Sequence, residues 1–440
     1  MSSNRCLLKL LTIFAAIQLA AAQEPVNMQK IMERLDSLEK QNQRLLEEIK
    51  ALREVVKAQS APDAQDTQDR LTRAEDRIAE QAQTKVGTAQ HLPVLLTGMI
   101  LFDASQVRGT TNNSFQQTYG SYGEGTPGGG ATLRQSIIGL SVQGPAIAGG
   151  GRVNGSISMD FYAGSVNDNV FRIRNGDVSL DWANRSVSVG QDKTIIAPLQ
   201  PTSFAHVGIP ALTGAGNLWL WRPQVKYEER HAFTSNTAMV FDAALFSTAE
   251  SNTTVPSLAS NVATGGPAVQ GRFGLTHNWN ARTRVAVGIG AHESHSYLAG
   301  RSIPSRVISS DFLFKPLHWL ELTGTLFKGE NFANLGGLPV SIASNGVSLI
   351  PVKGTAGWMQ VALPLTNRLT FDAYAGRQVN AARYLSPFQI GGTLVYAGNL
   401  LYRFGPNVIL GFEAGRENVI YVNHTLILAN RYDATLAYLF

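Results

Sequence analysis

Apolar and polar residues alternate along most of this chain with a period of two. The stretch 430–440 shows this most clearly, because every second residue from Tyr432 to Phe440 is apolar, while Arg431, Asp433 and Thr435 hold polar side chains at the alternate positions. This period is typical of a β-strand with one apolar and one polar face. About ten tilted residues of such a strand cross the hydrocarbon of a bilayer, with aromatic rings at its interfaces. Similar segments recur back to Leu92, which predicts an all-β membrane barrel with Tyr438 and Phe440 as its outer-membrane assembly signal.

Short turns alternate with long loops rich in Gly, Ser and Asn between these segments. Turn residues divide 92–440 into about sixteen antiparallel strands, and counts of fourteen or eighteen stay open because short strands are easily miscounted. An even number places both ends of the barrel on one side of the membrane. The expected strands are 92–105, 131–143, 152–164, 169–182, 185–193, 217–232, 237–247, 268–278, 282–293, 306–314, 319–327, 353–363, 368–379, 390–404, 407–415 and 425–440.

One expected strand, 169–182, changes parity along its length. Arg172 and Arg174 occupy the same alternate positions as the apolar residues near its end. A β-bulge inserts one residue and exchanges the two faces. We therefore expect a bulge near Asn175–Gly176.

The expected strand 217–232 carries charged or amide side chains at five alternate positions, from Arg222 to Arg230. Its other face is apolar and includes Trp221 and Val225. A row of charges does not suit a packed core, but it suits a water-filled lumen. The long loop before this strand, 194–216, could fold inward and narrow such a lumen.

The N-terminus has the pattern of a targeting segment. Arg5 and Lys9 precede an apolar run of about ten residues, which is too short to span ~30 Å as a helix. Small residues at Ala20–Ala22 then offer a cleavage site, so residues 1–22 are expected to be a signal peptide. No later stretch holds about eighteen consecutive apolar residues, as a transmembrane helix requires.

Residues 23–60 carry a heptad pattern that predicts a periplasmic coiled coil. Apolar residues at position e favour three parallel strands, and Asn42 at position a would fix their register. A single amphipathic helix lying on its own barrel remains an alternative. Pro62 ends the helix, and 61–91 is expected to be a weakly helical linker. The expected coiled-coil core consists of Ile31, Leu35, Leu38, Asn42, Leu45, Ile49 and Leu52.

Composition narrows the possible chemistry. The single cysteine, Cys6, lies in the signal peptide, so the mature chain has no disulfide, no catalytic thiol and no cysteine metal site. Residues 23–91 carry a net charge of −2, whereas the segment from Leu92 carries +5. This mild positive charge favours anionic solutes, but it is too weak and too dispersed to indicate nucleic-acid binding.

Two short motifs resemble known sites but lie in the wrong context. Gly123–Gly128 matches G-x-G-x-x-G, yet Pro127 and the glycines after it prevent a helix from starting there. His292–His295 has the spacing H-E-x-H at a strand end, where alternation places His292 and Glu293 on opposite faces. We therefore expect no metal and no cofactor.

Charged residues of both signs fall on the polar parity of the expected strands. Arginines at a constriction would bind carboxylate or phosphate groups bidentately, while charges of both signs would orient dipolar solutes. The alternative is that these charges only pair across strands and keep the lumen hydrated. The candidate pore-lining and selectivity residues are Arg172, Arg174, Arg222, Lys226, Arg230, Arg272, Asp160, Asp242 and Asp311.

Several local patterns make the chain similar to a known family. They are Val189–Asp192 closing the fifth strand, Arg222–Tyr227 in the sixth, and Phe327–Asn331 after the eleventh. Together with the signal, coil and barrel, they resemble the DcaP-type porins, relatives of the phosphate-selective porin group. The resemblance implies a homotrimer and uptake of small, often negatively charged solutes. Asp192 and Lys226 depart from the family's usual uncharged residue and arginine.

The sequence as a whole predicts an outer-membrane porin with its N-terminal coil in the periplasm. It would pass small hydrophilic, anionic solutes by passive diffusion, as a homotrimer in outer-membrane lipid, without acting as an enzyme. A structural barrel that tethers the envelope to peptidoglycan, with a largely closed pore, is the alternative. A barrel hydrolase and a large soluble β-sandwich or propeller are the other possibilities.

Overall fold

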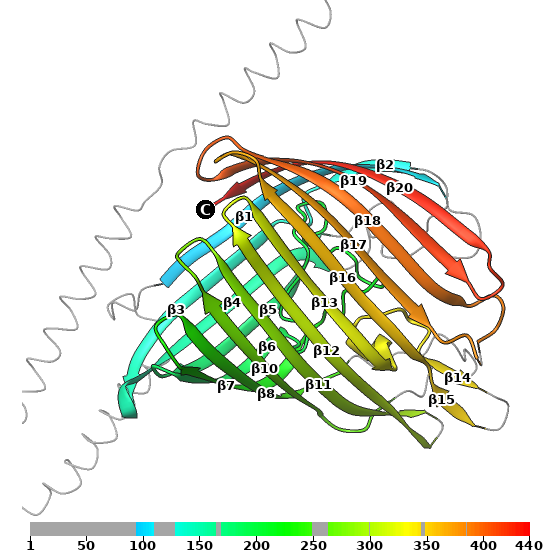
Figure 1. The fold of residues 1–440 in the computed structure, drawn as a ribbon, viewed down its shortest axis with the longest axis horizontal. Coiled ribbons are helices and arrows are strands. Elements are labelled where there is room, and N and C mark those ends of the chain that lie inside the picture. Colours follow the sequence, from blue (N-terminus) through cyan, green and yellow to red (C-terminus); the bar gives the residue numbers. More distant parts are fainter. Residues whose placement is uncertain are drawn as a thin grey trace, which may run out of the picture. The chain divides into compact units, whose positions relative to one another are not determined.

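The computed structural model of this chain describes residues 94–109, 128–163, 169–248, 263–298, 300–344, 348–383 and 385–440. These residues form a closed, antiparallel β-barrel (Figure 1). The predicted signal peptide, coiled coil and linker lie outside the described residues.

Sixteen strands form the barrel wall. The sheet has 18 named strands, but β2 and β3 pair with the same strand, β1, and β9 and β10 both pair with β11, so each couple acts as one interrupted strand. β14 (Ile342–Ser344) and β15 (Leu349–Pro351) form a separate hairpin, and the short 3-10 helices are η1 (Ala148–Gly150) and η3 (Phe332–Leu335). The strands of the wall are β1 (Val94–Gly109), β2 (Gly128–Thr132), β3 (Ile137–Ile147), β4 (Gly151–Ala163), β5 (Val170–Asp181), β6 (Arg185–Lys193), β7 (Trp221–Ala232), β8 (Thr237–Phe246), β9 (Ala263–Thr264), β10 (Ala268–Asn278), β11 (Arg284–Leu298), β12 (Arg301–Leu317), β13 (Leu320–Glu330), β16 (Lys353–Pro364), β17 (Leu369–Asn380), β18 (Ile390–Arg403), β19 (Val408–Tyr421) and β20 (Leu426–Leu439).

The barrel closes where the last strand meets the first. β20 pairs with β1 from Met99 opposite Leu439 to Gly109 opposite Ala429. Beyond the last paired residue, the backbone amide of Gly98 donates to the Phe440 carbonyl at 2.9 Å, and the Phe440 amide donates back at 3.1 Å. The predicted strand count is confirmed, and the terminal strand is the one that removes the open edge of the sheet.

The bulge predicted for the strand 169–182, which is β5 in the structure, is confirmed. Ser158 of β4 pairs with Asn175 of β5, but the next residue, Met159, pairs with Ile173, so Arg174 is the extra residue. Because of this insertion, the even-numbered Arg172 and Arg174 face the lumen up to and including the bulge, and the odd-numbered Asp177 faces it beyond the bulge.

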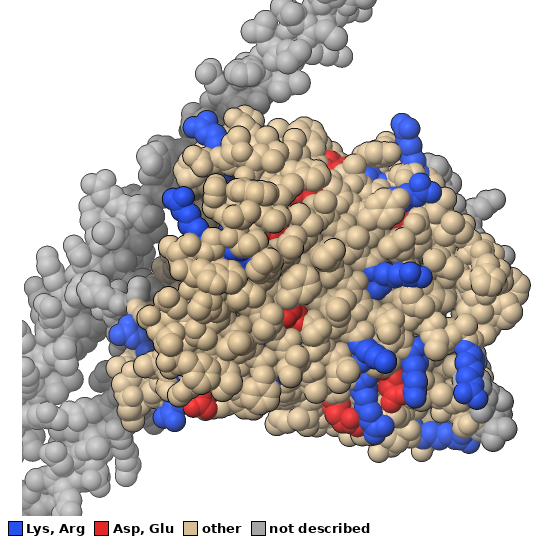
Figure 2. All heavy atoms as spheres, in the orientation of Figure 1, with Lys and Arg blue, Asp and Glu red and all other residues tan. Residues whose placement is uncertain are grey.

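The two faces of the wall have opposite chemistry. Outward side chains are large, apolar and exposed, for example Ile100, Phe273 and Ile289, with exposed fractions of 54%, 51% and 64%. Inward positions hold buried polar or charged groups, such as Asp160 and Asp311. Most of the surface in Figure 2 accordingly carries no charge. This is the reverse of a water-soluble sandwich and suits a wall between lipid and water.

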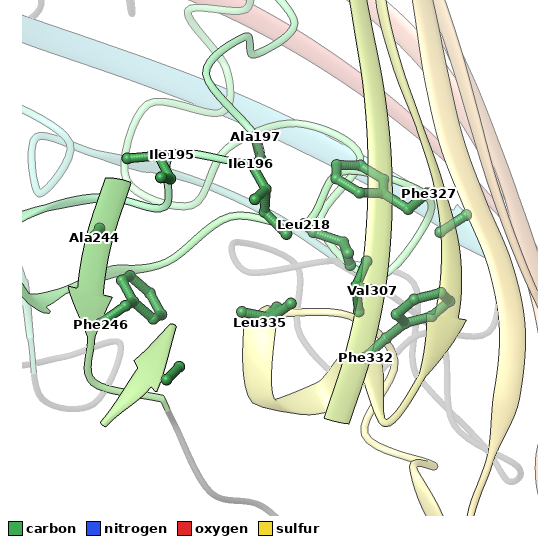
Figure 3. Close-up of a cluster of buried hydrophobic side chains, with 12 residues drawn as sticks. Ile195, Ile196, Ala197, Leu218, Ala244, Phe246, Val307, Phe327, Phe332 and Leu335 are labelled. Atoms are coloured by element: carbon green, nitrogen blue, oxygen red, sulfur yellow. The ribbon is translucent and has the colours of Figure 1, made fainter. Parts of the chain in front are cut away.

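The long connection between β6 and β7, residues 194–220, lies inside the barrel. Its residues Ile196 and Leu218 are fully buried and pack against wall residues such as Val307 and against Leu335 of η3 (Figure 3). The predicted inward fold of this loop is confirmed. The sixth strand begins at Trp221 rather than at 217, because 217–220 belong to the inward loop. We call residues 194–220 the inward loop.

None of the helices within the described residues is long and apolar enough to cross a membrane.

Candidate functional site

Side chains of the wall hold the inward loop by its backbone, and several of them are neutral amides. Gln135, which is buried, accepts hydrogen bonds from the amides of Val207 and Gly208 at 2.8 and 2.7 Å, and it donates to the Ala205 carbonyl at 3.0 Å. Gln270 likewise accepts from the Thr194 hydroxyl at 2.9 Å. An amide both donates and accepts, so it satisfies buried loop backbone without adding charge.

The far part of the loop is fixed to strands on another side of the barrel. The Thr202 amide donates to Gln360 of β16 at 2.6 Å, and its carbonyl accepts from Asn399 of β18 at 2.8 Å. The Ser203 hydroxyl donates to Glu413 of β19 at 2.6 Å. The loop therefore crosses the lumen from β6 to β16, β18 and β19 and reduces the open cross-section.

The loop turns back through two close backbone approaches. Gly216 has a φ of 106°, which favours glycine, and a Cβ there would lie 2.1 Å from the Gly357 carbonyl oxygen. A Cβ on Gly376 of β17 would lie 2.2 Å from the Ala215 carbonyl oxygen. Glycines on both partners allow the loop to lie directly on the wall.

Two of the predicted selectivity arginines form one cluster with a predicted aspartate. Arg172 donates to Asp160 through Nε at 3.1 Å and Nη2 at 2.6 Å, and Arg174 Nη1 donates to the same carboxylate at 2.8 Å. The two guanidiniums also donate to the carbonyls of Gly208 and Val207 in the inward loop, at 2.5 and 2.8 Å. The cluster thus joins β4, β5 and the loop.

Aromatic rings and a third arginine complete this arginine cluster, which we define as Arg134, Arg172 and Arg174. The guanidinium of Arg174 lies 4.3 Å from the ring centroid of Trp221, and that of Arg134 lies 4.8 Å from the ring of Tyr162. Arg172 and Arg174 share the Asp160 carboxylate, and Arg134 donates to the carbonyls of Phe161 and Ala163 at 3.3 and 3.0 Å. The cluster therefore carries more guanidiniums than carboxylates, and its charge is positive. The prediction that Trp221 lies on the apolar outer face was wrong. At the first residue of β7, beside the inward loop, its ring instead covers lumen arginines.

A second cluster, on β1, β19 and β20, is mainly acidic. Arg431 lies 2.8 Å from Asp433 and 3.7 Å from Asp103, and Glu413 accepts from the Tyr374 hydroxyl at 2.7 Å. These residues are at least nine-tenths buried, and three carboxylates surround one arginine. Gln135 links the two clusters, because its amide also donates to Asp103 at 2.9 Å.

One titratable side chain of the inward loop lies against this acidic cluster. His206 Nε2 is 3.5 Å from Glu413. Burial, together with the nearby Arg431, lowers the pKa of His206 well below its ordinary value of 6.5. The imidazole is therefore neutral at pH 7.

The third cluster contains the remaining predicted acids. Arg272 of β10 donates to Asp311 of β12 at 2.9 and 2.8 Å and to Asp242 of β8 at 3.3 Å. The intervening residue on β11 is Gly288, where a Cβ would lie 2.4 Å from the guanidinium. The structure brings all three predicted residues together, and both carboxylates are used for pairing.

The other three predicted basic residues do not join the arginine cluster. Arg222 donates to the carbonyls of Ser247 and Thr248 at 3.2 and 2.7 Å. Lys226 is 3.7 Å from Glu228, and Arg230 is exposed near the end of β7. The lumen side of β7 is charged as predicted, but these side chains lie apart from Arg172 and Arg174.

The candidate metal motif is divided between the two faces of the wall, as predicted. His292 is 3% exposed and bonds Gln270 and Ser294, whereas Glu293 lies on the outer face and pairs with Arg306. No group of three potential metal ligands occurs among the described residues.

Comparison with known proteins gives a fold but no sequence family. No protein-family model matches the chain, and no curated protein matches it. The outer-membrane channel DcaP of Acinetobacter baumannii has a similar structure, with a TM-score of 0.65 at 18% identity, over 79% of this chain and 97% of that chain.

Two further porin structures are similar at lower scores. The anion-selective porin from Comamonas acidovorans has a TM-score of 0.51 at 12% identity and covers 79% of this chain and 99% of its own. OmpF of Salmonella typhi, in complex with daunomycin, also has a TM-score of 0.51 at 12% identity, over 79% and 98%. The chain therefore has the fold of bacterial outer-membrane porins.

Proposed function

We propose that this protein is an outer-membrane porin through which small hydrophilic solutes diffuse passively. The observation that carries the proposal is the wall itself, which is apolar outside and lined inside by charged and amide side chains. Water and polar solutes are stable only on the inner side. The fold shared with the outer-membrane channel DcaP supports the same function.

We further propose that solutes carrying a carboxylate or phosphate are favoured at the inward loop. The arginine cluster presents three guanidiniums beside the loop, and guanidinium forks bind such anions bidentately. The acidic cluster around Glu413 and Asp433 lies next to it along the wall. Charges of both signs beside one narrow passage would orient a solute by its dipole. The natural solute is thus expected to carry an anionic group and a neutral or cationic remainder.

Conductance measurements test this proposal. Purified protein in planar bilayers should show discrete channel openings, and a salt gradient should give a reversal potential that reports the ratio of anion to cation permeability. Asp160→Asn keeps the arginines and removes their counter-charge, so it should raise anion preference. Arg222→Gln with Lys226→Gln should lower it. Unchanged reversal potentials in both variants would contradict a role of these charges in selectivity.

The tightly packed interior favours one alternative, a barrel that serves mainly as an envelope tether. Ile196, Leu218, Phe332 and Leu335 form an apolar contact between two connections inside the wall. A tether with a closed lumen would show little or no conductance in the same bilayers. Deleting residues 23–91 from such a tether would also abolish its binding to peptidoglycan.

For assembly, we propose a homotrimer formed by barrel contacts and by the coiled coil of residues 23–60, with that coil in the periplasm. The heptad core from Ile31 to Leu52 supports this proposal. Deleting 23–60 should lower the thermal stability of the trimer in detergent. A full-length protein that sediments as a monomer in mild detergent would contradict the proposal.

A further inference from the structure

The outer wall of the barrel has a groove between an apolar area and a charged area. The floor of the groove is a row of small residues on three neighbouring strands, because Gly271 of β10 pairs with Ala243 of β8 on one side and with Ala291 of β11 on the other. Larger outward side chains, Phe273 and Ile289, stand beside this row. The small side chains of this row leave a groove between the larger ones.

The apolar part of the groove continues towards β13. Ile308 of β12 pairs with Ala291, and it pairs on its other side with Lys328 of β13. Ile289, Ile308 and Leu326 have exposed fractions of 64%, 61% and 58%. Such exposed aliphatic side chains around a narrow floor fit an acyl chain better than the flat surface of another protein.

The charged part lies at the end of the same groove, next to the long connection between β13 and β16. Arg306 donates from Nε to both oxygens of Glu293 at 3.0 Å, and its Nη1 lies 3.9 Å from Glu330. Lys328 and Lys353 also line the groove and are exposed. Lys353 lies opposite Glu330 in the pairing of β13 with β16, but within the described part of the chain Glu330 pairs with Arg306 and neither lysine forms an ion pair. Figure 2 shows this gathering of Lys and Arg with two acidic patches over the ends of β11–β13.

We propose that this groove binds a phosphate-bearing lipid of the outer leaflet, with an acyl chain over Gly271 and Ala291 and a phosphate between Lys328 and Lys353. The apolar floor accepts the chain, and the two lysines supply the charge that a phosphate needs. The proposal rests on the proposed function to the extent that the long connections must face the outer leaflet. It concerns the outer wall only, so it does not depend on how solutes pass through the lumen.

The test uses full-length protein in detergent, with lipid A as the probe and native mass spectrometry to count bound lipid. Lys328→Gln with Lys353→Gln should lower retention of lipid A at least about tenfold, since each basic residue near an anionic lipid surface contributes roughly fivefold to binding and the two contributions multiply. Gly271→Leu should fill the groove and lower retention as well. The wall has room for a side chain at position 271, because the heavy atom nearest to a Cβ on Gly271 is 4.0 Å away.

Matched controls separate the groove from general effects. Arg108→Gln removes an exposed basic residue of β1, and Gly155→Leu adds a side chain at a β4 glycine whose Cβ would have a nearest neighbour at 3.9 Å. Both should retain lipid A as the unaltered protein does. Equal retention in the lysine and Gly271→Leu variants would overturn the proposal. So would displacement of lipid A by inorganic phosphate, which would show a site for the anion alone.

Conductance distinguishes this proposal from the porin function. The lysine variant should conduct as the unaltered protein does, since both side chains lie on the outer face. Loss of lipid with unchanged conductance supports both proposals. Conductance without specific lipid retention would support the porin function and contradict the lipid site. Specific lipid retention without conductance would support the lipid site and contradict the porin function.

Discussion

The hydroxyl of Ser203 donates a hydrogen bond of 2.6 Å to the carboxylate of Glu413, and this bond joins the inward loop to a strand on another side of the barrel. The two residues are 210 positions apart in the sequence. Glu413 is also bonded to Tyr374 at 2.7 Å, so the wall holds the acceptor in place before the loop arrives. The width of the passage therefore depends on a few polar contacts as well as on the strand number.

Ser203→Ala should loosen the loop and increase both the conductance and its fluctuations. A hydrogen bond to a charged group contributes about 1.5–3 kcal/mol, and Glu413 would lose one such bond. Single-channel recording of the variant checks this expectation. Ser158→Ala is the matched control, because Ser158 bonds Asn175 within the wall and does not touch the loop. Identical recordings from all three proteins would show that this contact does not limit the passage.

A methyl group on Gly376 should push the loop off β17. The Cβ of Gly376→Ala would lie 2.2 Å from the Ala215 carbonyl oxygen, so the loop or the strand must shift. Overpacking of this kind costs about 1–3 kcal/mol. We expect a lower unfolding temperature in detergent and a changed conductance. Gly398→Ala, whose Cβ would have its nearest neighbour at 3.5 Å, should behave as the unaltered protein; a Gly376 variant that is equally stable would contradict the close approach.

Alternation predicted the wall of this barrel almost completely, because lipid outside and water inside impose a choice at every position of a strand. Two strands, 185–193 and 268–278, have the predicted ends. The predicted bulge also lies where the structure has it, since parity within β5 can be followed in the sequence alone. Long-range pairing was not needed for either result.

The contents of the lumen could be predicted only in part, because they depend on contacts between residues far apart. Gln135 holds the loop and links two charge clusters, yet an isolated glutamine in a turn gives no signal in the sequence. Trp221 follows strand parity in the sequence, but its ring lies over Arg174 because the loop ends there. The lumen side of β7 was correctly predicted as charged, but the separation of Arg222 from Arg172 depends on the carbonyls of Ser247 and Thr248, which its guanidinium binds.

Removing Arg272 should destabilise the barrel more than removing most other arginines. Its guanidinium lies between the buried carboxylates of Asp242 and Asp311, so Arg272→Ala leaves two like charges without a counter-charge. Breaking a buried ion pair in this way costs about 3–5 kcal/mol. Urea unfolding in detergent, followed by tryptophan fluorescence, measures the loss. Arg403→Ala removes an exposed arginine whose guanidinium donates to the Pro406 carbonyl at 3.1 Å, and it should change stability by less than about 0.5 kcal/mol.

Acid should weaken the docking of the inward loop through His206. Burial and Arg431 lower the pKa of this imidazole in the docked loop below 6.5, so the docked state binds fewer protons than the undocked state. The contribution of a neutral His206 to docking is therefore complete above about pH 7 and decreases as pH falls below 6.5, because only the undocked imidazole readily accepts a proton.

The measurement is single-channel conductance at pH 7.5 and pH 5, with His206→Gln as the comparison. The unaltered protein should show a larger or noisier conductance at pH 5, whereas the glutamine variant, which has no proton to gain at this position, should show a smaller change. Charges elsewhere in the lumen are the same in both proteins, so the difference between their two pH responses isolates His206. Parallel pH responses would show that the loop stays docked when this imidazole is protonated.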